Sequence, residues 1–356
     1  MKRKRRIIFY CLIALAVISV FVFRGERHPK EIHPDFSERN GTAIIMTGAA
    51  ARIPQEAALL EELQRRGMLN DVVFISGVSS GSLNAVMLNA ILTGKMSWYE
   101  YKGILYNIRN ENIYIQDDKK LPLNTQPFRN LLEQVVEKRL GYKTIGDLPI
   151  TTEISFVRIK PTELKKTVYR MCSRKINAET DTTLNLVDIM MASSAFPIVF
   201  PPVRINNVKT IPDSDYIDGG VGDDHVPYRA LLDFEKKRGI GVKRVYIISR
   251  QNDSIPRLSE ELANLGINDR GLFDRQDINL DNILKKGILN RLESYAKEAP
   301  DLVSRTYVWL PDYDRSFLFF NFDSLKVQYE ITSKWARTHD PVPLSEFLLP
   351  YLLKKQ

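Results

Sequence analysis

A serine within a run of small residues is the first feature of this sequence that could do chemistry. The run Gly77–Gly81 reads Gly-Val-Ser-Ser-Gly, which fits the Gly-x-Ser-x-Gly pattern of a nucleophile elbow. In such an elbow a sharp strand-to-helix turn exposes the hydroxyl of the central serine. The flanking glycines, here Gly77 and Gly81, avoid clashes with neighbouring backbone. An apolar stretch ends just before the run and a helical pattern follows it, so Ser79 is favoured as a nucleophile over a plain turn of small residues.

A serine nucleophile needs a base, and the best candidate here is a carboxylate. Asp218 is followed by Gly219 and Gly220, which predicts a turn that another loop can approach closely. Partial burial there would raise the carboxyl pKa toward that of a working base. An ordinary Asp-Gly turn is the alternative interpretation. Histidines are poorer candidates, because the four in the chain fall in a predicted linker or in ordinary polar segments (His28, His33, His225 and His339).

A loop of very small residues supplies a candidate oxyanion hole. Gly48, Ala49 and Ala50 follow an apolar stretch and precede a helical pattern. Backbone N–H groups exposed in such a loop can bind a negatively charged oxygen, and the side chain of Arg52 could brace the loop. A generic Gly-Ala turn is the competing interpretation.

In order and spacing, these motifs resemble those of the patatin-like phospholipases. The elbow follows the small-residue loop by about 30 residues, and Asp-Gly-Gly comes about 140 residues after that. The runs Ala192–Pro197 and Phe200–Pro202 add to the resemblance, which covers roughly residues 40–250. It implies a three-layer α/β/α sandwich with a Ser79–Asp218 dyad, and neither a catalytic histidine nor a metal or organic cofactor. It also implies an oxyanion loop formed by Gly48, Ala49 and Ala50, with Arg52 at the arginine of that loop.

The oxyanion loop departs from the family pattern. Ala49 and Ala50 stand where the family usually has glycines, and Ile53 replaces a glycine after the arginine. Alanine adopts a positive φ only at a cost of about 1–2 kcal/mol, so we expect a differently built hole and weaker activity. The segment His225–Pro227 also differs from the family, which often has an asparagine before this proline.

The elements around these motifs predict an α/β layered domain. Apolar strands at 43–46 and 72–75 alternate with helices that begin near Pro54 and Ser82. The strands are continuously apolar, which indicates a sheet covered by helices on both faces. Further along, the sequence predicts a largely helical stretch at 97–150, followed by a pair of strands at 152–159 and 166–171. It then predicts a helix at 184–195, a strand at 245–248 and two or three surface helices at 250–301.

The N-terminus has the pattern of a membrane segment. Five cations, at positions 2–6, precede an uncharged run of 17 residues from Ile7 to Phe23, which is roughly 26 Å of helix. Bulky residues at 21–24 argue against a signal peptidase site, so an uncleaved anchor is favoured over a cleaved signal. The cations before the run favour a cytoplasmic N-terminus and a catalytic body on the far side of the membrane.

Charge and cysteine content narrow the function classes. Residues 1–30 hold eight basic residues and one acid, which leaves 43 basic and 42 acidic residues in the body of the chain. The net charge of +8 is therefore a property of the terminus and does not indicate nucleic-acid binding. Cys172 is the one cysteine of the body, so no disulfide is expected there. The sequence suggests an anchor at 1–24, a linker at 25–40, a catalytic core at 41–250 and a C-terminal helical extension at 251–356 packed on that core.

The leading hypothesis is a membrane-anchored serine hydrolase of lipid acyl esters, with phospholipid or lysophospholipid as substrate. One alternative is an α/β-hydrolase esterase with a Ser79-Asp218-His339 triad, which follows the chain order of that fold. Another is a catalytically inactive lipid-binding or scaffold protein of the same fold, suggested by the alanines in the oxyanion loop. The sequence does not set the oligomeric state.

Overall fold

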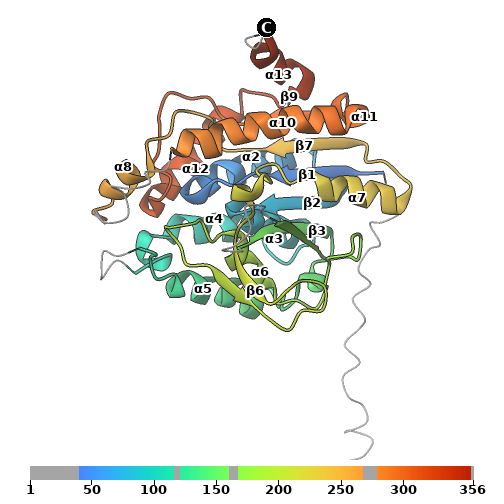
Figure 1. Cartoon of the computed structure of the whole chain (residues 1–356). Coiled ribbons are helices and arrows are strands. Elements are labelled where there is room, and N and C mark those ends of the chain that lie inside the picture. Colours follow the sequence, from blue (N-terminus) through green and yellow to red (C-terminus); the bar gives the residue numbers. More distant parts are fainter. Residues whose placement is uncertain (1–39, 116–120, 160–166, 268–278, 354–356) are drawn as a thin grey trace, which may run out of the picture. The chain divides into compact units, whose positions relative to one another are not determined.

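The computed structural model describes residues 40–115, 121–159, 167–267 and 279–353 (Figure 1). The predicted anchor at 1–24 lies outside these residues, as does nearly all of the predicted linker. Among the described residues, no helix has the length and apolar character needed to cross a membrane.

Within the described residues, a nine-stranded mixed sheet forms the centre of the fold. Eight strands follow in the order β5-β6-β3-β2-β1-β7-β8-β9, and β4 pairs with β3 off this path. The five inner strands, from β3 to β8, run parallel, whereas β4, β5, β6 and β9 pair antiparallel with their neighbours. The strands are β1 (Thr42–Met46), β2 (Val72–Val78), β3 (Thr151–Arg158), β4 (Thr167–Cys172), β5 (Val203–Ile205), β6 (Ser214–Asp218), β7 (Arg244–Ile248), β8 (Thr306–Trp309) and β9 (Val342–Pro343).

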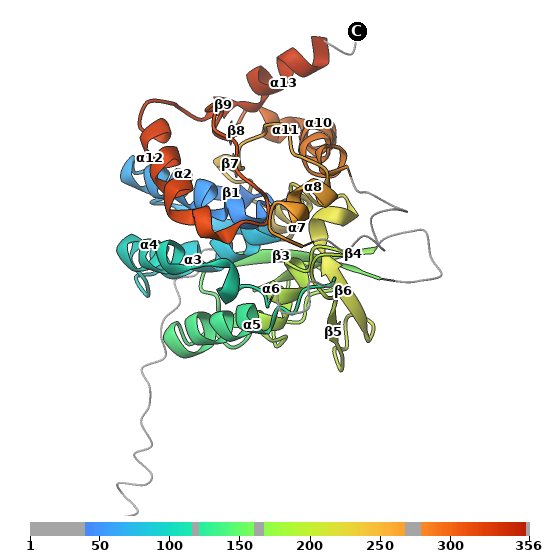
Figure 2. The same ribbon diagram turned by 90° about the vertical axis from the view of Figure 1, so that its left-hand side faces the viewer.

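Both faces of the sheet are apolar, and helices cover each of them. Along β1, Ile44 and Met46 pack with α2 and α3, whereas Ala43 and Ile45 pack with α7 and α10. Figure 2 shows α2 and α12 on one side of the sheet and α7, α10 and α11 on the other. The predicted three-layer α/β/α arrangement is confirmed for the described residues.

Local sequence signals account for several helix ends. Pro54 lies in the first turn of α2, where its missing N–H costs nothing, and Ser97 caps α4 by accepting from the Glu100 N–H. The α-helices are α2 (Ile53–Arg65), α3 (Ser80–Leu92), α4 (Trp98–Asn107), α5 (Gln126–Leu132), α6 (Leu186–Ser193), α7 (Arg229–Arg238), α8 (Leu258–Ala263), α10 (Lys286–Glu298), α11 (Pro300–Val303), α12 (Leu325–Ala336) and α13 (Leu344–Leu353). Short 3₁₀ turns include η2 (Ala50–Arg52) and η6 (Gly219–Gly222).

The C-terminal third contributes more than the predicted helical extension. Its strands β8 and β9 continue the central sheet beyond β7. Helix α10 buries Ile288, Leu292 and Tyr295 against the sheet, so it is a layer of the core rather than a surface helix. The prediction of a purely helical extension at 251–356 is thus incomplete. It failed because β8 and β9 have only four and two residues, too few to show a strand pattern.

Candidate active site

Ser79 lies on a strained turn between β2 and α3. Its backbone has φ 55° and ψ −131°, a conformation that costs a non-glycine residue roughly 1–3 kcal/mol. A side chain at Gly77 would collide with the Gly81 carbonyl, and one at Gly81 would collide with the Thr47 carbonyl. The glycines of the predicted elbow are therefore needed for the close approach of this turn to the neighbouring loop.

The sheet register brings Asp218 next to this serine. Val78 of β2 pairs with Ser155 of β3, and Phe156 of β3 pairs with Asp218 at the end of β6. Ser79 and Asp218 thus emerge on the two sides of one short stretch of β3. A Cβ on Gly219 would lie 2.7 Å from the Ser155 carbonyl oxygen, so a glycine is needed where this turn crosses the strand.

The environment of Asp218 suits a base at neutral pH. Burial raises the pKa of this carboxyl from 3.8 to about 7, while a hydrogen bond with the Ser79 side chain and another from the Gly220 N–H oppose the shift. The Gly220 N–H donates to Asp218 Oδ1 at 2.8 Å. Asp218 is only 3% exposed, so burial dominates. A buried carboxylate beside the candidate nucleophile, with a pKa near 7, is well matched to general-base catalysis.

Ser193 ties the two motifs together, a role that the sequence did not predict. Its buried hydroxyl accepts from the Ser79 N–H at 2.9 Å and donates to the Ser155 carbonyl at 2.7 Å. Two residues later, the Ala195 carbonyl accepts from the Asp218 N–H at 3.1 Å. The run Ala192–Pro197 therefore holds both the elbow and the Asp218 turn against β3.

The small-residue loop lies beside Ser79. A Cβ on Gly48 would be 3.0 Å from Ser79 Cβ and 3.5 Å from its hydroxyl oxygen. The Ala49 N–H donates to the Ser80 hydroxyl at 2.7 Å, so it is already engaged. Within the described residues, the N–H groups of Gly48 and Ala50 have no acceptor, and these two are the donors available to an oxyanion. Ala50 has φ 44°. This strained conformation is the one expected where an alanine occupies a position that favours glycine.

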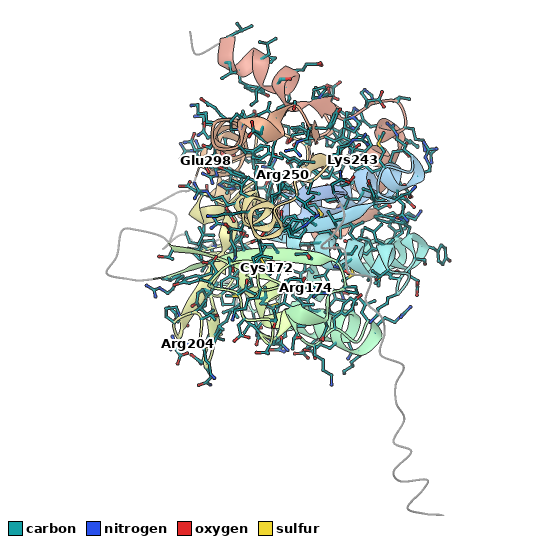
Figure 3. All side chains as sticks on the ribbon, turned by 90° about the vertical axis from the view of Figure 1, so that its right-hand side faces the viewer. Cys172, Arg174, Arg204, Lys243, Arg250 and Glu298 are labelled. Atoms are coloured by element: carbon teal, nitrogen blue, oxygen red, sulfur yellow. The ribbon has the colours of Figure 1, made fainter. Side chains whose placement is uncertain are left out.

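Arg52 braces this loop from behind. Its fully buried guanidinium forms an ion pair with Asp253 and donates from Nε to the Phe317 carbonyl at 2.9 Å. It also lies over the Phe319 ring, which it shares with Arg250, the buried arginine just after β7 (Figure 3). Because these partners occupy the guanidinium, we assign Arg52 to holding the loop in place rather than to contacting an oxyanion.

A second buried carboxyl group lies beneath the loop. Glu56 of α2 is fully buried and accepts from Thr47 Oγ1 and Asn84 Nδ2, each at 3.0 Å. Burial raises the pKa of Glu56 to about 8, against the opposing effects of these hydrogen bonds and of Arg250. Glu56 is therefore mostly protonated at neutral pH, and it links α2 to the start of the small-residue loop.

A narrow apolar cavity of about 60 Å³ adjoins Ser79. Its walls are mainly aliphatic and aromatic side chains from α3, α4 and α5, such as Leu83, Leu105 and Phe128. Phe322 and Leu325 complete the lining from the C-terminal third of the chain. A cavity of this kind next to a nucleophile suits the hydrocarbon part of an ester substrate.

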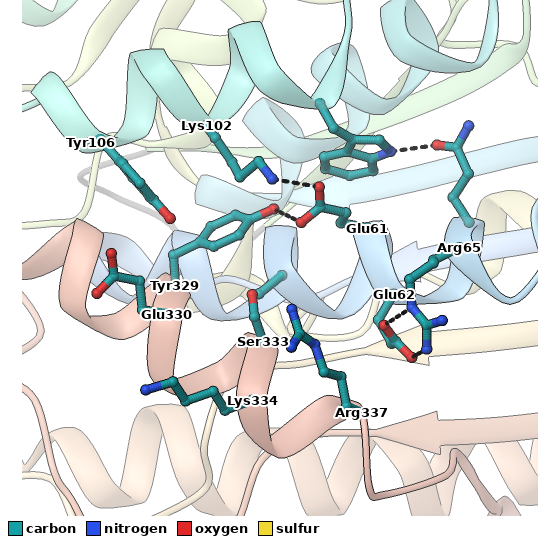
Figure 4. Close-up of a pocket in the computed structure, with 13 residues that line it drawn as sticks. Glu61, Glu62, Arg65, Lys102, Tyr106, Tyr329, Glu330, Ser333, Lys334 and Arg337 are labelled. Carbon is teal, nitrogen blue, oxygen red and sulfur yellow. Dashed lines mark hydrogen bonds and ion pairs between the residues drawn. The ribbon is translucent and has the colours of Figure 1, made fainter.

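A larger groove, of about 640 Å³, lies between α2, α4 and α12 and is lined mainly by charged and polar residues (Figure 4). None of its lining residues lines the Ser79 cavity. Across it, Lys102 pairs with Glu61 at 2.8 Å, and the Tyr329 hydroxyl donates to the same carboxylate at 2.7 Å. These contacts fasten α12 to α2 and α4. Ser333 also lines the groove, but within the described residues its hydroxyl has no hydrogen bond to a base.

His339 makes its contacts elsewhere. Its ring stacks on Trp335 at 4.2 Å between centroids, and Nδ1 bonds to the Trp335 carbonyl at 2.7 Å. Within the described residues, no hydrogen bond joins His339 to Ser79 or Asp218. The structure therefore does not bring together the Ser79-Asp218-His339 triad. Within the described residues, no group of three or more potential metal ligands is assembled.

Replacing Gly48 with alanine should lower kcat/KM for ester hydrolysis by about 100-fold or more, because the added methyl group fills the space beside the Ser79 hydroxyl. Circular dichroism and melting temperature should stay near wild type, since Gly48 has an ordinary φ. Gly103→Ala is the matched control, because a Cβ there meets no atom within 4 Å. Full activity in Gly48→Ala would show that this loop does not adjoin the reaction.

Replacing Glu56 with glutamine should stabilise the protein increasingly as pH rises from 5 to 8. The folded pKa of about 8 exceeds the ordinary value of 4.5, so the folded state binds the extra proton and wild-type stability falls as pH rises through this window. Glutamine mimics the protonated acid, because its amide can donate to Thr47 and its oxygen can accept from Asn84. The melting-temperature difference from wild type should grow between pH 5 and pH 8. A constant difference, or equal growth in the exposed Glu346→Gln control, would contradict this assignment.

The mixed sheet covered on both faces, with an elbow serine beside an Asp-Gly-Gly turn, defines a patatin-like α/β protein. The model of the patatin-like phospholipase family matches residues 43–232, more than half of the chain. The chain belongs to this family. No curated protein sequence matches it.

Several solved structures are similar to the chain at low identity. VipD from Legionella pneumophila has a TM-score of 0.36 and 13% identity, over 85% of this chain and 67% of VipD. The type III effector ExoU of Pseudomonas aeruginosa has a TM-score of 0.38 and 11% identity, over 87% of this chain and 53% of ExoU. Human GIVD cytosolic phospholipase A2 has a TM-score of 0.26 and 16% identity, over 37% and 22%. The chain thus spans about half of ExoU and about a fifth of the human protein.

Proposed function

We propose that the protein is a serine hydrolase of lipid acyl esters that uses a Ser79–Asp218 dyad. The observation that carries the proposal is the placement of the strained Ser79 and a buried Asp218, with a pKa near 7, on the two sides of β3. The apolar cavity beside Ser79 and the membership of the patatin-like phospholipase family support a lipid substrate.

In the proposed reaction, the Ser79 hydroxyl oxygen attacks the ester carbonyl carbon while Asp218 takes the hydroxyl proton. The N–H groups of Gly48 and Ala50 bind the oxyanion, and the N-terminus of α3 favours the same negative charge. Asp218 then returns the proton to the departing alkoxide, which leaves as an alcohol. Water deprotonated by Asp218 attacks the acyl-serine, and the carboxylic acid is released as Ser79 regains its proton.

Phospholipid or lysophospholipid is the substrate we propose, with the uncharged run Ile7–Phe23 as a membrane anchor that keeps the enzyme near it. The anchor is tested by carbonate extraction of membranes from cells that express the full chain. Wild type should stay with the membrane, whereas Leu12→Arg combined with Leu15→Arg should release it. Release of wild type would contradict the anchor and leave the dyad unaffected.

A serine-directed fluorophosphonate probe tests the proposed function. The wild-type protein should be labelled at Ser79 and should release acid from short-chain esters. A folded protein that neither labels nor hydrolyses would favour the inactive lipid-binding alternative. His339→Ala distinguishes the triad, because a dyad enzyme keeps full activity in that variant.

A further inference from the structure

We propose that a segment outside the family-matched region limits the length of the acyl chain that the active site accepts. This segment, the strap, comprises residues 316–325 and leads into α12. The family model ends at residue 232, so the strap lies beyond it. The inference rests on the proposed function, since it assigns the Ser79 cavity to the acyl group.

The strap closes one side of this cavity with two large apolar side chains. Phe322 and Leu325 line it together with Leu83, Leu105 and Phe128 from the family-matched part of the chain. The cavity volume of about 60 Å³ is far below the roughly 300 Å³ or more of a pocket for a drug-sized ligand, so it has room for a short acyl group and not for the whole of a long one.

Hydrogen bonds fix the strap to the rest of the site. The Phe317 carbonyl accepts from Arg52 Nε at 2.9 Å, and the Phe319 carbonyl accepts from the Ala51 N–H at 2.8 Å. The Phe322 N–H donates to Asn110 Oδ1 at 2.7 Å. These bonds restrain the strap at three of its residues, so the cavity wall is not a loose loop that a long acyl chain can displace freely.

The helix that follows the strap is fastened as well. Leu325 is the first residue of α12, and one turn later Gln328 donates to the Ala51 carbonyl at 2.9 Å. Figure 4 shows the next contact, from the Tyr329 hydroxyl to Glu61, with Lys102 on the same carboxylate. The position of Leu325 is therefore set by the same contacts that dock α12 on α2 and α4.

An apolar acyl chain gains free energy only for the part that is buried, so the position of this wall sets the optimum chain length. The strap also holds Ala51, next to the proposed oxyanion donor Ala50. One segment thus controls both the size of the acyl site and the placement of the loop. We expect short acyl esters to be better substrates than long ones for the wild-type protein.

The test compares kcat/KM of the full chain for p-nitrophenyl esters from acetate to decanoate. In wild type, kcat/KM should fall beyond butanoate. Phe322→Ala should raise the ratio of decanoate to butanoate by about tenfold, with Phe322→Leu giving a smaller shift in a better-packed variant. Phe347→Ala is the matched control, because it makes the same substitution in α13, outside the strap and the cavity lining, and should leave the ratio unchanged.

An unchanged ratio in folded Phe322→Ala and Phe322→Leu would overturn the strap inference while leaving the hydrolase intact. Absence of hydrolysis and of fluorophosphonate labelling in wild type would instead contradict the proposed function. In that case binding of sodium decanoate and sodium butanoate, measured by titration calorimetry, decides the inference. Phe322→Ala should then gain affinity for decanoate alone, and equal changes for both acids would overturn it.

Discussion

Ser79→Ala should lower kcat/KM for ester hydrolysis by about 10⁴-fold or more and abolish labelling by a fluorophosphonate. In the proposed mechanism the Ser79 oxygen forms the covalent acyl intermediate, and removal of a nucleophile of this kind leaves only the contributions of binding and of the oxyanion donors. The fold should be preserved, because the side chain is small and the backbone N–H still donates to Ser193. The measurement is initial rates on a short-chain ester, alongside labelling followed by mass spectrometry of the modified peptide.

Ser345→Ala is a suitable control for that variant, since it makes the same substitution at an exposed position in α13. It should keep wild-type rates. Hydrolysis by Ser79→Ala at a tenth of the wild-type rate or more would mean that another group attacks the ester. The elbow would then be a structural turn.

Asp218→Asn should lower kcat/KM by about 10²–10⁴-fold, the usual contribution of a general base. The amide keeps the size of the side chain and can still accept from the Gly220 N–H, but it cannot take the Ser79 proton. Asp215→Asn is the matched control, because it lies on the same strand with its side chain exposed. Wild-type rates in Asp218→Asn would place the base elsewhere.

The pH dependence of the wild type follows from the same carboxyl group. Asp218 accepts a proton only when it is ionised, and its pKa is about 7, so kcat/KM should fall about tenfold per pH unit below that pH. The free energy of unfolding should fall as pH rises, whereas the activity rises. The raised pKa means that the folded state binds the extra proton, and stability is lost as pH rises from 3.8 through 7. Asp218→Asn should therefore melt higher than wild type above pH 7 while being far less active.

The parts of the site that could be predicted from sequence are those whose chemistry is local. The elbow around Ser79 and the turn after Asp218 have short patterns of glycine and polar residues with a direct steric meaning. The structure brings both together across β3. It also shows Ala50 at a positive φ, as expected for an alanine at a glycine position. These features depend on neighbours in the chain, so a single sequence contains their signal.

Contacts between distant segments could not be predicted in the same way. Ser193 lies 114 residues from the N–H that it holds, and Arg52 bonds to a carbonyl 265 residues away. No local sequence pattern predicts a contact across either separation. The sequence signal for the strap is the apolar run Phe317–Phe322. So many apolar side chains in a loop indicate that the loop packs against the core. Treating residues 251–356 as one helical extension left this run without a predicted role.

Acid release from phospholipid by the full chain, by Ser79→Ala and by Asp218→Asn tests the central claim most directly. The substrate is short-chain phosphatidylcholine, assayed at pH 8, where Asp218 is largely ionised. The account predicts release by wild type and almost none by either variant. Equal release by wild type and Asp218→Asn, or release by Ser79→Ala, would contradict a Ser79–Asp218 dyad.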